Sequence, residues 1–260
     1  MLESVPTSGQ LFLPDRRATA NPQAALRLFC FPYAGGSAQI YRQWPASLPA
    51  AVEVCPVQLP GRGNRLLEPP FTTMAEVVAY LSDAVGPFLD KPFAFFGHSM
   101  GAVISFELAR SLRRARGVEP RHLFVSGRRA PQLPRTRPPI HQLPAPELIE
   151  ELRRLNGTPR EVLANAELMQ LMLPVIRADF AVVSSFRYTA EPPLGCPITA
   201  LGGLQDEDVP REHLEAWREQ TSAACTVRMF AGDHFFLQSA EPLLLRVLAR
   251  DLQQLAANLG

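Results

Sequence analysis

The sequence has little lysine, no long run of one charge sign and no long apolar run. Lys91 is the single lysine, and the 26 basic residues are balanced by 25 acidic ones to a formal charge of +1. This balance excludes the strongly basic surface expected of a nucleic-acid-binding protein. No stretch reaches the roughly 18 apolar residues of a membrane-spanning helix, and no apolar segment typical of a signal peptide opens the chain. We therefore expect a cytoplasmic protein that binds neither nucleic acid nor membranes.

Cysteines are few and widely separated. Cys30, Cys55, Cys196 and Cys225 form no C-x-x-C pair and mostly lie within apolar runs. Such cysteines are typical of small buried side chains in a reducing compartment. We expect neither a disulfide framework nor a metal site.

Length and composition predict one large domain. A chain of 260 residues with 47% hydrophobic and 20% charged residues lies within the range of a single α/β domain. Residues 1–24 contain three prolines and are expected to form a loosely ordered lead-in. We expect residues 25–260 to form the domain.

Short apolar runs alternate with helical patterns along this domain, which is typical of a mostly parallel sheet with helices on both faces. The expected strands are Leu26–Phe31, Val52–Val57, Phe93–Gly97, His122–Ser126, Pro197–Leu201 and Thr226–Phe230. The expected helices are Ile40–Leu48, Met74–Leu89, Met100–Arg114, Arg211–Gln220 and Glu241–Leu255.

About 70 residues separate the fourth and fifth expected strands, more than a crossover needs. This insertion, about 131–190, opens with prolines and carries two helical patterns, Glu147–Leu155 and Glu161–Phe186, the second of which Pro174 should kink or divide. The apolar face that includes Leu171, Met172 and Val175 favours a lid over a binding chamber. The alternative is a structural decoration.

One local motif carries catalytic chemistry. Gly97-His98-Ser99-Met100-Gly101 is a G-x-S-x-G between an expected strand and an expected helix. In this context the motif predicts a nucleophile elbow, a strained turn that exposes the serine hydroxyl at the carboxyl edge of the sheet. Ser99 is the predicted nucleophile, and the alternative is an ordinary strand-to-helix turn.

A serine nucleophile needs a general base and an acid that orients the base, and in this architecture they follow in the order serine, acid, histidine. His234 follows the last expected strand and is the predicted base. Asp206 follows the preceding strand and is the preferred acid, with Asp208 as its rival; Glu207 and Asp233 fit less well. The other histidines, His98, His122, His141 and His213, are expected to be structural or on the surface.

Acyl transfer also needs hydrogen-bond donors for the oxyanion. The backbone N–H of Met100, at the start of a helix, is one candidate. The glycine-bearing loop after the first strand supplies the second, which we assign to Ala34.

Four segments together resemble the type II thioesterases that accompany modular polyketide and nonribosomal peptide synthetases. They are Phe31-Pro32-Tyr33-Ala34-Gly35-Gly36-Ser37-Ala38, Gln58-Leu59-Pro60-Gly61-Arg62-Gly63-Asn64-Arg65, Gly97-His98-Ser99-Met100-Gly101-Ala102 and Gly232-Asp233-His234-Phe235-Phe236-Leu237. The resemblance runs from about Leu26 to the C-terminus. It implies an α/β-hydrolase fold with an inserted helical lid and hydrolysis of acyl groups from the phosphopantetheine arm of acyl or peptidyl carrier proteins. It implies no metal or bound cofactor, and we expect a monomer.

The resemblance also bears on individual residues. The acid of the family lies in a G-x-x-D-x-x-V motif, which falls on Gly203, Asp206 and Val209 and favours Asp206. Many members have two glycines before the histidine, where this chain has Gly232 and Asp233. Arg62 and Arg65 are candidates for steering the phosphate arm or an acidic carrier protein, and the alternative is a pair of solvated loop arginines.

Other functions remain open at this point. A medium-chain acyl carrier protein thioesterase is related to the same family, and a carboxylesterase of small free esters would use the same three side chains. A noncatalytic binding protein of this fold is a further alternative, against which the retained serine, acid and histidine argue.

Overall fold

The computed structural model describes residues 21–135 and 137–259, so most of the expected lead-in lies outside the described residues. Six strands form one sheet in the order β2-β1-β3-β4-β5-β6, and every neighbouring pair is parallel. Each strand matches its predicted range to within two residues, which confirms the predicted parallel sheet. The strands are β1 (Leu26–Phe31), β2 (Val52–Pro56), β3 (Phe93–His98), β4 (Leu123–Ser126), β5 (Ile198–Gly203) and β6 (Cys225–Phe230).

The central strands are buried on both faces. Every residue of β3 and β4 is buried, and in the ladder between β1 and β3 Phe29 faces Phe95. Continuous apolar strands of this kind are expected where helices cover both sides of a parallel sheet. The core therefore consists of two apolar layers, one on each face.

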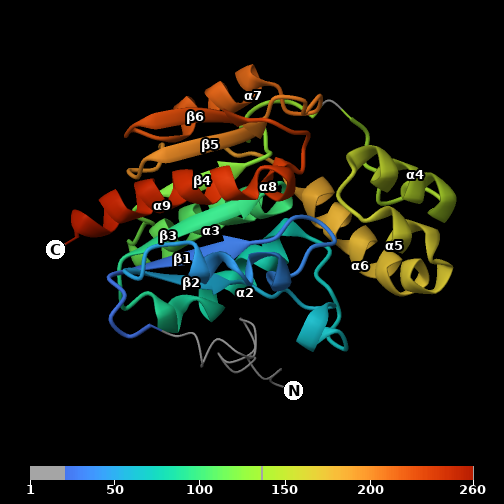
Figure 1. The fold of residues 1–260 in the computed structure, drawn as a ribbon, viewed down its shortest axis with the longest axis horizontal. Coiled ribbons are helices and arrows are strands. Elements are labelled where there is room, and N and C mark those ends of the chain that lie inside the picture. Colours follow the sequence, from blue (N-terminus) through green and yellow to red (C-terminus); the bar gives the residue numbers. More distant parts are fainter. Residues whose placement is uncertain (1–20, 136, 260) are drawn as a thin grey trace.

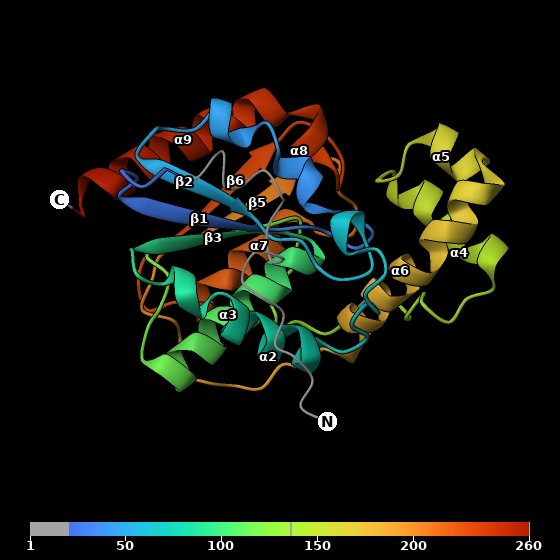
Figure 2. The ribbon, with the colours of Figure 1, turned by 90° about the horizontal axis from the view of Figure 1, so that it is seen from below.

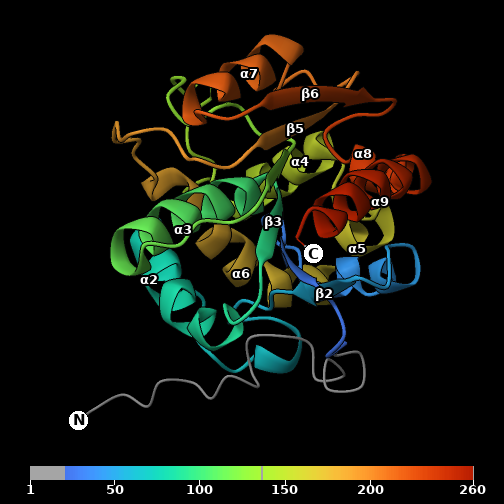
Figure 3. The same ribbon diagram turned by 90° about the vertical axis from the view of Figure 1, so that its left-hand side faces the viewer.

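Helices cover the two faces (Figures 2 and 3). On one face lie α2 (Met74–Ala84), α3 (Met100–Arg116), α7 (Arg211–Glu215) and the 3₁₀ turn η6 (Ala216–Gln220); on the other lie α8 (Phe236–Ser239), α9 (Glu241–Ala257) and the 3₁₀ turns η2 (Ala38–Tyr41) and η3 (Trp44–Ala46). The remaining 3₁₀ turns are η4 (Gly63–Arg65) and η5 (Gly86–Phe88).

Three predicted helices are shorter or more divided than expected. The segment 40–48 forms two 3₁₀ turns instead of one α-helix, with Pro45 at the start of the second, where a missing N–H interrupts a helical ladder. Similarly, α2 ends at Ala84, before the Gly86-Pro87 pair of η5. The predicted helix 211–220 is divided into α7 and η6.

The insertion between β4 and β5 contains α4 (Ala145–Leu155), α5 (Arg160–Ala164) and α6 (Ala166–Ser185), which lie beyond one end of the sheet (Figure 1). These helices share a small apolar cluster of their own, built on Leu148, Leu152, Leu163, Met169 and Ile176. Helix α6 also contacts α2 and α3. The insertion is thus packed against the main body through α6.

The break in the second inserted pattern lies at Asn165 and not at Pro174. The Asn165 side chain accepts a hydrogen bond from the N–H of Leu168 at 3.1 Å and so caps the start of α6. Pro174 lies inside α6, which continues through it, so of the two predicted effects of Pro174, a kink or a division of the segment, the division does not occur. Among the described helices α6 alone is long and apolar enough to cross a membrane by length and composition, but it carries Asp179, whose carboxylate is buried in an ion pair.

Candidate active site

Ser99 lies in a strained turn between β3 and α3. Its φ of 52° and ψ of −107° fall in a region that non-glycine residues rarely adopt. The carbonyl of Ser126, at the end of β4, accepts the Ser99 N–H at 2.8 Å and holds the turn against the neighbouring strand. This is the geometry of a nucleophile elbow, which places the hydroxyl above the carboxyl edge of the sheet.

The two glycines of the motif are required by close backbone contacts. A Cβ at Gly97 would lie 2.1 Å from the carbonyl oxygen of Gly101, and a Cβ at Gly101 would lie 2.1 Å from that of Phe31. Neither backbone atom can move without displacing β1 or the first turn of α3. The G-x-S-x-G spacing therefore reflects the packing of this turn.

His234 and Asp206 are in direct contact. His234 Nδ1 and Asp206 Oδ2 are 2.7 Å apart, and both residues lie in loops that follow the two last strands of the sheet. Burial opposes ionisation of Asp206, but the hydrogen bond from His234 and those from the N–H groups of Asp208 and Val209 outweigh it and lower the pKa of Asp206. The carboxylate is therefore ionised at neutral pH and holds the His234 ring through Nδ1.

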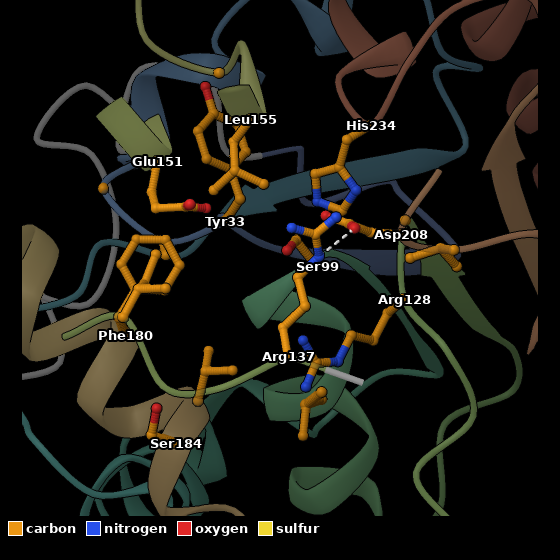
Figure 4. A pocket seen from close by; sticks show the side chains of 18 of the residues that line it. Tyr33, Ser99, Arg128, Arg137, Glu151, Leu155, Phe180, Ser184, Asp208 and His234 are labelled. Carbon is orange, nitrogen blue, oxygen red and sulfur yellow. Dashed lines mark ion pairs between the residues drawn. The ribbon is translucent and has the colours of Figure 1, made fainter. Parts of the chain in front are cut away.

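Asp208, the rival acid, points elsewhere. Its carboxylate lies 2.7 Å from Arg137 Nε and 3.3 Å from Arg154 Nη1 (Figure 4). It lines the same chamber as Ser99 and His234 but makes no hydrogen bond to His234 within the described residues. The geometry therefore favours Asp206 as the orienting acid.

His98 is buried beside the site, in contact with the ring of His234. The sequence did not predict this contact. Its Nδ1 lies 2.8 Å from Ser126 Oγ, and its ring centroid lies 5.2 Å from that of His234. Burial lowers the pKa of His98 well below its ordinary value, and the proximity of His234 lowers it further. His98 is therefore a neutral ring packed against the proposed base.

Met100 and Ala34, the candidate oxyanion donors, lie next to Ser99 in the chain and in the lining of the chamber, respectively. Met100 is the first residue of α3, so its N–H has no acceptor within the helix. Ala34 lies in the loop after β1 and lines the chamber with Ser99 and His234. The N–H of the next residue, Gly35, is already bound to Asp179 Oδ2 at 2.7 Å.

Arg62 and Arg65 are both buried, at 7% and 2% exposure. Arg62 forms two hydrogen bonds with the Asp179 carboxylate, at 2.6 and 2.7 Å, and a third with the carbonyl of Gly36 at 3.0 Å. Arg65 donates to Glu68 Oε1 and to the carbonyl of Gln58, at 2.8 and 2.9 Å. Their burial contradicts the alternative of solvated loop arginines, and their engagement by protein acceptors does not support a role in steering a phosphate arm or a carrier protein.

The Arg62–Asp179 ion pair instead joins three segments. Asp179 belongs to α6 of the insertion, Arg62 to the loop after β2, and the bound Gly35 and Gly36 to the loop that presents Ala34. Neither partner is within 100 residues of the other, so the sequence alone offered no signal for the pairing. The pair fixes the predicted oxyanion loop against the insertion.

Loss of this ion pair is expected to destabilise the protein. Asp179→Ala leaves the Arg62 guanidinium buried without its counter-ion and the Gly35 N–H without its acceptor, so we expect the free energy of unfolding to fall by about 3–5 kcal/mol. Denaturant unfolding monitored by circular dichroism measures this. Asp83→Ala is the matched control, because the Asp83 side chain is 80% exposed and pairs with Arg116 at 3.6 Å, an arrangement worth less than about 1 kcal/mol. Equal small losses in the two variants would contradict the structural role of the buried pair.

A chamber of about 720 Å³ lies between Ser99 and the insertion (Figure 4). Helix α6 contributes Met172, which was predicted, together with Ile176, Phe180 and Val183. The other two predicted wall residues lie elsewhere: the Leu171 side chain is 57% exposed, and Val175 packs at Gly61, both outside the lining. A helical face rotates by about 100° per residue, so neighbouring positions of one apolar stripe have different surroundings.

The insertion also contacts the loop that carries His234. Asn156, at the end of α4, donates to Asp233 Oδ2 at 2.8 Å, and Asp233 Oδ1 accepts the N–H of Phe235. A Cβ at Gly157 would lie 2.0 Å from the Phe235 ring. The aspartate that departs from the double-glycine pattern thus binds the insertion and its own loop.

Comparisons with known proteins agree on one family. The thioesterase domain model matches residues 26–252. Linear gramicidin dehydrogenase LgrE of Brevibacillus parabrevis is 51% identical over 234 residues, 89% of each chain. The thioesterase RedJ from the prodiginine pathway of Streptomyces coelicolor superimposes with a TM-score of 0.83 at 42% identity, over 89% of this chain and 87% of that one. The type II thioesterase BorB from the borrelidin cluster gives a TM-score of 0.81 at 40% identity, over 89% and 94%.

Proposed function

The chain belongs to the thioesterase family, among the type II thioesterases of polyketide and nonribosomal peptide biosynthesis, and from this premise we propose that Ser99, His234 and Asp206 hydrolyse acyl thioesters carried on phosphopantetheine arms. The substrates are stalled or misprimed acyl units on carrier proteins of a synthase. The enzyme acts as a soluble monomer in the cytoplasm and needs no resident metal or cofactor, because the phosphopantetheine arrives with the substrate.

The observation that carries this proposal is the convergence of three loops on one chamber. Ser99 follows β3, Asp206 follows β5 and His234 follows β6, and Ser99 and His234 line the same space. Because parallel strands end at one edge of the sheet, residues 135 positions apart lie together there.

The proposed mechanism depends on which ring nitrogen of His234 faces Asp206 and which faces Ser99. Asp206 binds Nδ1–H of His234, so Nε2 is left to accept the proton of the Ser99 hydroxyl as it attacks the thioester carbonyl. The N–H groups of Met100 and Ala34 stabilise the oxyanion. A thiol leaves with a pKa near 8.5 and so needs little protonation, and water activated by His234 then releases the acyl group from Ser99.

A comparison of thioester and oxygen-ester substrates tests the proposal. We expect acyl groups on a phosphopantetheinylated carrier protein to be hydrolysed with a kcat/KM far above that of oxygen esters with the same acyl chain. A preference for the free oxygen esters would replace this proposal with a carboxylesterase. The dehydrogenase activity in the name of LgrE belongs to that protein; here the same region presents a serine, an aspartate and a histidine, which support hydrolysis.

The chamber wall offers a separate test of the lid. Met172→Trp places a larger side chain in the chamber wall and reduces the free volume of the chamber, so we expect the ratio of long-chain to short-chain kcat/KM to fall by about tenfold or more, with little loss of stability. Leu171→Trp is the control on the adjacent residue, which is exposed and outside the lining, and should leave the ratio unchanged. Equal losses for all chain lengths, matched by a drop in melting temperature, would show that Met172 is ordinary core.

A further inference from the structure

The chamber is rich in arginine, and most of these arginines already have partners. Among the described residues, Glu151 and Asp208 are the acidic side chains that line it, and they are bound by Arg154 and Arg137. Arg135 and Arg187 donate to backbone carbonyls at the end of α6, and Arg129 donates to the carbonyl of Pro134. Both acids of the chamber are therefore neutralised by cations other than Arg128.

Arg128 differs from these five arginines. Its backbone is fixed, since its carbonyl accepts the Trp217 indole N–H at 2.8 Å, and its side chain extends into the chamber (Figure 4). The guanidinium makes no hydrogen bond or ion pair with the residues that the structure describes, 21–135 and 137–259. Burial and the nearby Arg129 and Arg135 lower the pKa of Arg128 to about 10, which leaves it charged at neutral pH. A guanidinium with five donors that faces the chamber and has no protein acceptor among the described residues is available to an anionic ligand.

The position of Arg128 points to the acyl end of the substrate. Ser126, two residues earlier, accepts the Ser99 N–H, so Arg128 starts from the same edge of the sheet as the nucleophile. When a thioester carbonyl meets Ser99, the acyl substituents lie close to it, whereas the phosphate lies at the far end of the extended pantetheine arm.

We propose that Arg128 is a specificity-determining residue that binds an anionic oxygen group, a carboxylate, on the acyl chain. This inference rests on the proposed function and names a substrate class for it: short acyl units that carry a carboxylate in addition to the thioester. A guanidinium pairs with a carboxylate through two parallel N–H···O bonds, which gives the recognition a fixed geometry. A guanidinium also binds phosphate, so the test must distinguish a carboxylate on the acyl chain from the phosphate of the pantetheine arm.

The test compares malonyl and propionyl thioesters, which have equal numbers of carbons, on phosphopantetheinylated carrier protein and on pantetheine, which lacks the phosphate. We expect Arg128→Gln to lower kcat/KM for the malonyl thioester by about 10- to 100-fold and that for the propionyl thioester by less than about threefold, on both carriers. Arg128→Lys should recover part of the loss. Arg187→Gln is the control, because Arg187 lines the same chamber but donates to the carbonyls of Ser184 and Phe186.

Binding measured by calorimetry in the Ser99→Ala background separates this inference from the proposed function. A selective loss of affinity for malonyl-pantetheine in Arg128→Gln supports the inference, whether or not the wild-type protein hydrolyses these thioesters. Absence of hydrolysis of both thioesters by the wild-type protein would end the proposed function but not the inference. Hydrolysis that Arg128→Gln reduces equally for both acyl groups, or leaves unchanged, would overturn the inference and leave the proposed function standing. A loss seen only with phosphate-bearing carriers would also overturn it and place the anion in the arm.

Discussion

Ser99→Ala is expected to lower turnover of carrier-bound acyl thioesters by about a millionfold, and His234→Ala by a similar factor. The effects should not add in the double variant, because the nucleophile and its base act as one unit. Single-turnover assays on purified, folded variants measure this. A Ser99→Ala protein that retains turnover would end the assignment of Ser99 as nucleophile.

The strain at Ser99 supplies a second readout of the same site. Alanine keeps the Cβ in the φ of 52°, whereas glycine adopts this conformation without steric cost. We therefore expect Ser99→Gly to be as inactive as Ser99→Ala but more stable, by about 1 kcal/mol. Equal stability of the two variants would show that the turn is unstrained.

The sheet and the elbow could be predicted from sequence because their signals are local. Runs such as Phe93-Ala94-Phe95-Phe96 are apolar without interruption, and the glycines around Ser99 are demanded by contacts within a few residues or with the adjacent strand. The order of serine, acid and histidine then follows from the common edge at which parallel strands end.

Features that depend on distant partners could not be predicted. An arginine in a glycine-rich loop is usually solvated, and the burial of Arg62 depends on Asp179, which lies 117 residues away on an inserted helix. The helix break at Asn165 and the continuation of α6 through Pro174 likewise depend on packing that the local sequence does not show. Which residues of α6 line the chamber depends on the orientation of the helix about its own axis, and a broad apolar face in the sequence does not determine that orientation.

The insertion is joined to the site by contacts of different strength. Helix α6 is tied to the oxyanion loop by Asp179, whose side chain is 3% exposed, whereas α4 is tied to the loops of His234 and Asp208 by more exposed contacts, the hydrogen bond of Asn156 to Asp233 and the ion pair of Arg154 with Asp208. Since a buried ion pair is much harder to break than such exposed contacts, α4 can separate from the site at lower cost than α6. Chamber residues from α6 are thus part of the fixed frame of the site.

Asp206→Asn is expected to lower kcat by about 10⁴-fold, because the side-chain amide of the asparagine would hold His234 in the wrong tautomer. The N–H groups of Asp208 and Val209 donate to Asp206 Oδ1 at 3.0 and 3.2 Å, so the asparagine oxygen should stay there and its NH₂ should face His234 Nδ1. Nδ1 must then accept a hydrogen bond, which puts the ring proton on Nε2 and removes the lone pair that takes the proton of Ser99.

Asp208→Asn is the matched control for this change. Its carboxylate binds Arg137 and Arg154 and makes no hydrogen bond to His234 within the described residues, so we expect kcat to fall by less than about tenfold. Steady-state kinetics on one carrier-bound substrate, with melting temperatures recorded in parallel, compare the two variants. A larger loss in Asp208→Asn than in Asp206→Asn, at equal melting temperatures, would transfer the role of the acid to Asp208.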